Sequence, residues 1–72
     1  MNTFAYVSGQ KVTIGDSVCF KSDIEQSGTI IGIKANRMGE VCLKLENEYG
    51  FSGDYIGGET ETVERAKDCW ID

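Results

Sequence analysis

The chain has 72 residues, and its 12 acidic and 7 basic side chains give a net charge of −5. A chain of this length buries only about 60% of its unfolded surface, so we expect one small domain over residues 1–72. No apolar run approaches the roughly 20 residues that cross a bilayer, and the opening MNTFAYVSGQ lacks a signal-peptide pattern, so we expect no membrane contact. Three widely spaced cysteines favour reduced thiols in the cytoplasm over a disulfide framework.

The acidic side chains are concentrated toward the end of the chain. Residues 1–45 carry five basic and four acidic side chains, whereas residues 46–72 carry two basic and eight acidic ones. Binding of nucleic acid depends on cations that neutralise phosphates, so we expect no nucleic-acid partner. The acidic third either keeps a small protein soluble or faces a protein partner.

Alternation of apolar and polar side chains predicts strands, and helical periodicity is nearly absent. A Gly-Asp turn precedes DSVCFK, residues 16–21, in which Val18 and Phe20 share one face. The segment SGTIIGIK, residues 27–34, is β-branched but does not alternate strictly. A bulge or bend near Gly32 would resolve its pattern.

The turn NRMG, residues 36–39, is short enough to join the preceding strand and residues 40–46 as a hairpin. In EVCLKLE, residues 40–46, the side chains of Val41, Leu43 and Leu45 face one way, and polar side chains or cysteine face the other. This period of two predicts a strand with one buried face.

The end of the chain predicts one more strand and a pinned tail. ETETVER, residues 59–65, is expected to pair as a strand with Thr60, Thr62 or Val63 inward. The tail ERAKDCWID is too short for an isolated helix, so we expect one helical turn or an edge strand pinned by Trp70. The indole of Trp70 is expected either to plug the core or to anchor a partner.

The run IGDSVCF, followed by SGTIIGI and EVCLKL, is similar to the opening of small SH3-like barrels of the KOW and Tudor type. In that family a Gly-Asp turn precedes the first strand, and a Gly-x-Ile/Val segment begins the second. The resemblance covers the segment from Val12 to Leu45. It implies an all-β fold, a small, partly open, antiparallel SH3-like barrel of about five strands. The lack of proline agrees with it, because a closing sheet protects its own edges.

The segment GFSGDYIGG, residues 50–58, combines four glycines with aromatic side chains and has two interpretations. In the first interpretation, the segment is a connection between strands. Its glycines supply positive φ, while Phe51 and Ile56 fold back to fill the open end of the barrel. Alternatively it is a binding loop in which an aromatic ring stacks on a flat ligand and bare N–H groups approach it. The predicted ligand-binding residues are Tyr49, Phe51, Gly53, Asp54, Tyr55, Gly57 and Gly58.

Catalytic and metal chemistry find little support in the sequence. Histidine is absent, which removes the commonest general base and metal ligand. A carboxylate pair of Asp54 with Glu59 or Glu61 would need a raised pKa, and exposed loops provide little desolvation. The cysteines lack a C-x-x-C spacing, and a zinc site of three thiolates and Asp68 would require distant segments to converge. We predict no enzyme, metal or cofactor, and reduced cysteines that serve packing or a subunit interface.

The segments DIEQSGTI and GDYIGGETETVERAKDCWID resemble small accessory proteins encoded by tailed bacteriophages. That resemblance implies a non-catalytic counter-defence role in the host cytoplasm. The first hypothesis is that the Gly/aromatic loop of a homo-oligomer sequesters a small nucleotide-like signal, because a pocket of roughly 300–1,000 Å³ is hard to enclose in one small domain. The alternative is an acidic inhibitor that blocks a host protein, through its C-terminal third or a strand edge, by imitating nucleic-acid charge.

Overall fold

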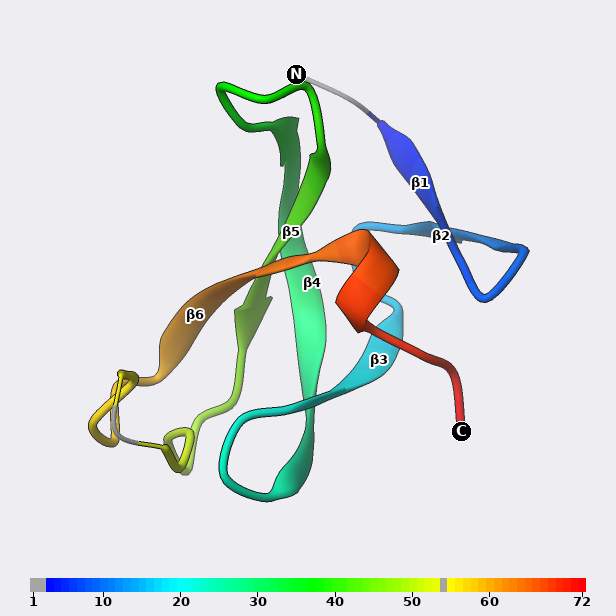
Figure 1. The fold of residues 1–72 in the computed structure, drawn as a ribbon. Coiled ribbons are helices and arrows are strands. Elements are labelled where there is room, and N and C mark those ends of the chain that lie inside the picture. Colours follow the sequence, from blue (N-terminus) through cyan, green and yellow to red (C-terminus); the bar gives the residue numbers. More distant parts are fainter. Residues whose placement is uncertain (1–2, 54) are drawn as a thin grey trace.

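The computed structural model describes residues 3–53 and 55–72, which form an all-β protein with two antiparallel sheets (Figure 1). No helix in this part of the chain has the length and apolar character to span a membrane. The elements are β1 Phe4–Val7, β2 Gln10–Thr13, β3 Ser17–Lys21, β4 Glu25–Ala35, β5 Val41–Glu46, β6 Glu61–Arg65 and the 3₁₀ turn η1 Ala66–Asp68.

The prediction of about five strands is wrong, because a hairpin of β1 and β2 brings the number in the described residues to six. Ser8 and Gly9 form its turn with φ of 52° and 78°. Two successive positive φ values give the turn whose twist matches that of the flanking strands. Ala5, Val7 and Val12 face the core from this hairpin and are buried.

The four strands predicted between residues 16 and 65 are confirmed and form one sheet in the order β3-β4-β5-β6. The predicted irregularity is a β-bulge between Ile30 and Gly32, where β4 pairs with β5. The turn at 36–39 closes the β4–β5 hairpin, with the N–H of Asn36 donating to the carbonyl of Glu40 at 2.9 Å. Of the three candidates for the inner face of β6, Thr62 is half-buried, whereas Thr60 and Val63 are exposed.

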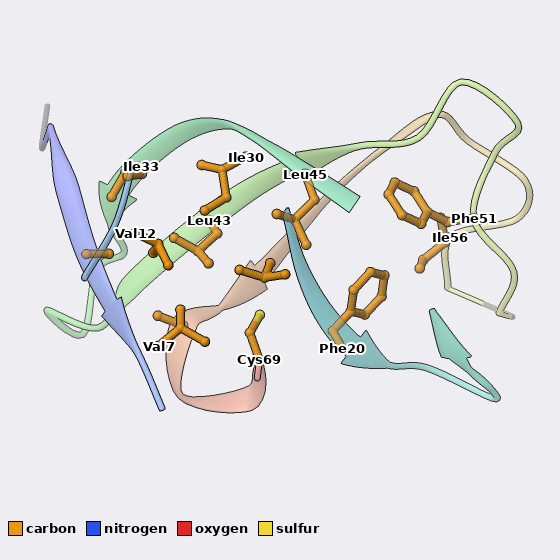
Figure 2. Close-up of a cluster of buried hydrophobic side chains, with 13 residues drawn as sticks. Val7, Val12, Phe20, Ile30, Ile33, Leu43, Leu45, Phe51, Ile56 and Cys69 are labelled. Carbon is orange, nitrogen blue, oxygen red and sulfur yellow. The ribbon is translucent and has the colours of Figure 1, made fainter. Parts of the chain in front are cut away.

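The core is built from the predicted strand faces of the larger sheet, together with side chains of the β1–β2 hairpin, the β5–β6 loop and the tail (Figure 2). Val18, Phe20, Leu43 and Leu45 are fully buried, and Val41 packs against them from the end of β5. Val7 and Val12 lie at one end of the cluster in Figure 2, and two side chains of the β5–β6 loop lie at the other.

The tail returns to the edge of β3 (Figure 1), and both expected forms occur in it. After η1, Trp70 and Cys19 exchange two backbone hydrogen bonds of 2.8 and 2.9 Å. The Trp70 side chain is half-buried. Strand pairing in the described residues therefore gives two sheets and one isolated bridge, without a continuous barrel.

Candidate functional site

The candidate site is the loop between β5 and β6, residues 47–60, which we call the Gly/aromatic loop. Irregular backbone pairing folds it onto itself: the N–H of Asn47 donates to Thr60 O (2.9 Å), and the N–H of Phe51 donates to Glu59 O (2.9 Å). The N–H of Gly58 returns a hydrogen bond to Phe51 O (3.0 Å). The predicted ligand-binding residue Asp54 lies outside the described residues.

The glycines of the loop have backbone roles. Gly50, Gly53, Gly57 and Gly58 have φ of 86°, 123°, 64° and 86°, a region that side-chain-bearing residues rarely adopt. A Cβ at Gly50 would lie 2.6 Å from the carbonyl oxygen of Gly58, so the two arms of the loop meet only because this position has no side chain. The interpretation of the segment as a connection with positive φ is confirmed.

Phe51, one of the predicted ligand-binding residues, has its ring buried in the core and not presented to solvent. Its side chain is 1% exposed, and the neighbouring Ile56 is 6% exposed. The Phe51 ring packs edge-on to Phe20, with ring centroids 5.4 Å apart, at the end of the core in Figure 2. Room for it comes from Gly28 on β4, where a Cβ would lie 2.8 Å from the ring. Aromatic side chains contribute strongly to the stability of a core in which they are buried.

Two residues that the sequence analysis did not select hold the loop in place. The side-chain amide of Gln26 on β4 donates to Ser52 O (2.7 Å) and accepts from the N–H of Ser52 (2.9 Å). The Ser22 hydroxyl donates to the same carbonyl (2.7 Å) and accepts from Gln26 Nε2. The Gln26 amide therefore both donates to and accepts from the backbone of one loop residue, as a neighbouring strand would. Because Ser52 is 26 positions away in the sequence, no local sequence pattern predicts this pairing.

Tyr49 is an exposed residue of the loop. Its side chain is 90% exposed, and its N–H donates to Oδ1 of Asn47 (2.9 Å). It borders a groove of about 380 Å³ on the outer face of the sheet. The other residues that line this groove are Ser17, Ser27, Gly28, Thr29, Glu46, Asn47 and Glu48.

Tyr55 occupies a different place and does not line the Tyr49 groove. Its hydroxyl donates to both carboxylate oxygens of Glu64 at 3.2 Å, and the hydroxyl of Thr62 donates to the same carboxylate at 2.7 Å. Partial burial and the adjacent Glu64 raise the pKa of Tyr55 above its ordinary value. The structure therefore does not bring the two tyrosines of the loop together around one ligand.

The groove beside Tyr49 is acidic. Neither Glu46 nor Glu48 forms an ion pair with any described residue, and neither lysine nor arginine lines the groove. Cations of the C-terminal third are engaged elsewhere: Lys67 Nζ and Arg65 lie 2.8 and 3.7 Å from the Glu40 carboxylate. The hydrogen bond from Lys67, followed by that from Asn36, lowers the pKa of Glu40.

The cysteines are unpaired: Cys42 and Cys69 are buried, and Cys19 is half-buried. Over residues 3–53 and 55–72, no cluster of three or more cysteine or carboxylate side chains is placed to hold a metal ion. Burial, followed by the charges of Glu64 and Asp68, raises the pKa of the Cys69 thiol to about 12. A thiol held neutral in this way is a packing group and a poor nucleophile.

Comparisons of the chain with protein-family models, with curated proteins and with solved structures gave no match. A fold by itself does not define a function, which depends on the chemistry of the site.

Proposed function

We propose that the protein is a non-catalytic binding protein whose acidic loop face binds a basic surface of a partner protein. The acidic loop face consists of Glu46, Glu48, Tyr49 and the groove beside them. The observation that carries the proposal is the Tyr49 ring, 90% exposed beside two carboxylates that have no ion-pair partner in the described structure. Exposed aromatic side chains are typical anchors of binding surfaces, and unpaired carboxylates attract a cationic partner.

The proposed fold type is a small, partly open SH3-like barrel. Two features support it: η1 turns the chain after β6, and Trp70 then bonds to Cys19 on β3. The tail thereby links the two outer strands of the four-stranded sheet, as expected for a sheet that curls toward closure.

Charge favours a protein partner over an anionic ligand at this face. A phosphate entering the Tyr49 groove would approach Glu46 and Glu48 with no lysine or arginine in the lining. The negative phosphate and the two carboxylates would repel each other, whereas arginine or lysine from a partner would pair with both carboxylates. In the counter-defence role implied by the phage resemblance, the acidic loop face would imitate nucleic-acid charge and block a nucleic-acid-binding surface of a host protein.

Fluorescence anisotropy with a labelled nona-arginine peptide tests this proposal. We expect salt-sensitive binding that Tyr49→Ala weakens about tenfold, or about 1.4 kcal/mol, with Tyr6→Ala as the exposed-tyrosine control. Glu46→Gln with Glu48→Gln should weaken binding more than the matched pair Glu25→Gln with Asp72→Asn. Equal losses of affinity in the two pairs of variants would show that the peptide responds only to the net charge of the protein, and would overturn the proposal.

The second candidate function is sequestration of a small nucleotide-like ligand by a homo-oligomer. The groove volume of about 380 Å³ favours it, because this lies within the range of small-molecule pockets, and hydroxyl and amide groups line the groove. The groove is open to solvent, so a second copy would have to close it. Calorimetry against a panel of cyclic nucleotides should then give heat, and light scattering should show an oligomer. No heat from a monomer rejects this candidate.

A further inference from the structure

A second groove, of about 420 Å³, lies on the outer face of β4, β5 and β6. The groove lies next to the β-bulge of β4, where Gly32 is the register partner of Lys44 on β5. Because Gly32 has no side chain, the space opposite the Lys44 side chain is left open. A Cβ at Gly32 would lie 3.3 Å from Lys44 Cβ, which is tighter than an ordinary contact. We call this feature the Gly32 groove; its lining residues are Ile31, Gly32, Ile33, Lys34, Cys42, Lys44 and Val63.

The Gly32 groove is largely apolar although it lies outside the core. Ile31 and Val63 are 36% and 52% exposed and form part of its walls. Cys42 is only 6% exposed, but it is not a member of the core cluster. Its side chain therefore lies on the outer face of the sheet, covered by its neighbours in the groove. A concave apolar surface on the solvent side of a sheet is the kind of feature that binding partners cover.

Two lysines give the Gly32 groove a positive rim on an acidic protein. Lys34 has no ion-pair partner in the part of the chain that the structure describes. Lys44 lies 3.1 Å from Glu61, but both side chains are about half-exposed, so water and other anions compete with this pair. The net charge of −5 means that a cationic rim here is a local feature and not a general property of the surface.

We propose that the Gly32 groove binds a small amphipathic anion, with a flat or branched apolar body and one carboxylate, sulfonate or phosphate group. The apolar body would lie over the Gly32 backbone between Ile31 and Val63, where no side chain intervenes. The anion would pair with Lys34 and compete with Glu61 for Lys44. The volume is at the small end of ligand pockets, which fits one or two rings better than a polypeptide. This site is separate from the acidic loop face and does not depend on the proposed function.

A fluorescence titration with anilinonaphthalene sulfonate, an aromatic anion, tests the proposal. We expect saturable binding that Lys34→Glu and Ile31→Ser each weaken by about fivefold or more. The matched controls Lys21→Glu and Ile24→Ser change an exposed lysine and an exposed isoleucine outside the groove, and should stay within about twofold of the wild type. N-phenylnaphthylamine, which has the same rings without the charge, should bind more weakly than the sulfonate.

The thiol in the lining gives a second readout. Saturating anilinonaphthalene sulfonate should slow alkylation of Cys42 about fivefold or more, and leave the rate at Cys19 unchanged. Absent or unsaturable binding by the wild type, equal losses in groove and control variants, or equal protection of both thiols would each overturn the proposal. Lys34→Glu adds negative charge and should not weaken nona-arginine binding at the acidic loop face, so failure here and failure of the proposed function are distinguishable.

Discussion

Tyr49 and Phe51 are two positions apart in one loop and have opposite environments. The intervening Gly50 has φ of 86° and turns the chain, so the ring of Phe51 enters the core while that of Tyr49 stays in water. Side chains at i and i+2 would share a face if the loop were a regular strand. The conformation of one glycine therefore decides which aromatic side chain stabilises the fold and which is available to a partner.

This difference in burial predicts a large loss of stability for substitution of Phe51 and almost none for substitution of Tyr49. Phe51→Ala should lower the free energy of unfolding by about 3–5 kcal/mol, because it leaves a cavity between Phe20 and Gly28. Tyr49→Ala should change it by less than about 0.5 kcal/mol, since the ring is 90% exposed. Denaturant titration measures both values. Similar losses in the two variants would mean that the loop is not folded as described.

Cys69 gives a prediction about pH. Burial is the largest cause that raises its pKa to about 12, and its Sγ donates a weak hydrogen bond to Arg65 O at 3.4 Å. The folded pKa exceeds the value of about 8.5 for an unfolded cysteine, so the stabilising contribution of the neutral thiol is fully present below about pH 8.5. It is lost progressively as pH rises from there to about 12, while the thiol of the folded state stays neutral. At pH 9 the native protein should therefore alkylate at Cys69 far more slowly than at Cys19, and equally at both in denaturant. Mass spectrometry of the labelled protein measures the two rates; equal native rates would contradict the assigned burial.

At the scale of elements, the side-chain amide of Gln26 connects β4 to the Gly/aromatic loop. Both hydrogen bonds to Ser52 are lost in Gln26→Ala, so amide exchange at Ser52 should accelerate and stability should fall by roughly 1–3 kcal/mol. Gln10→Ala, at an exposed position of β2, is the matched control and should change neither quantity. Exchange at Ser52 that is unchanged in Gln26→Ala would show that Phe51 and Ile56 alone fix the loop.

Two strands of the larger sheet, β3 and β5, could be predicted because their apolar side chains alternate, and the other two, β4 and β6, because their segments are rich in β-branched residues. The β1–β2 hairpin could not, because its strands have only four residues each, although the Ser8-Gly9 turn was visible in the sequence. In the candidate site, the positive φ values of the glycines could be expected from residue type. The burial of Phe51 and the Gln26–Ser52 pairing depend on contacts between distant segments, which no local pattern encodes.

At the scale of the whole molecule, the outer face of the larger sheet changes charge along β5. Glu46 lines the acidic groove beside Tyr49, and Lys44, two residues earlier in the same strand, lines the Gly32 groove. A partner protein bound at the acidic loop face would therefore meet a cationic region beside it, which would favour one orientation of the partner. Binding of a basic partner at the acidic loop face should weaken with rising salt, because both carboxylates are exposed.

The central claim is that the acidic loop face is the surface that binds a basic partner. Chemical-shift mapping of the isotope-labelled protein during titration with nona-arginine tests it most directly. We predict that the largest amide shifts occur at Ser17, Ser27, Thr29 and residues 46–49, with β1 and β2 unaffected. Shifts that follow every exposed carboxylate equally, that concentrate on the β1–β2 hairpin, or that do not occur at all would contradict the claim.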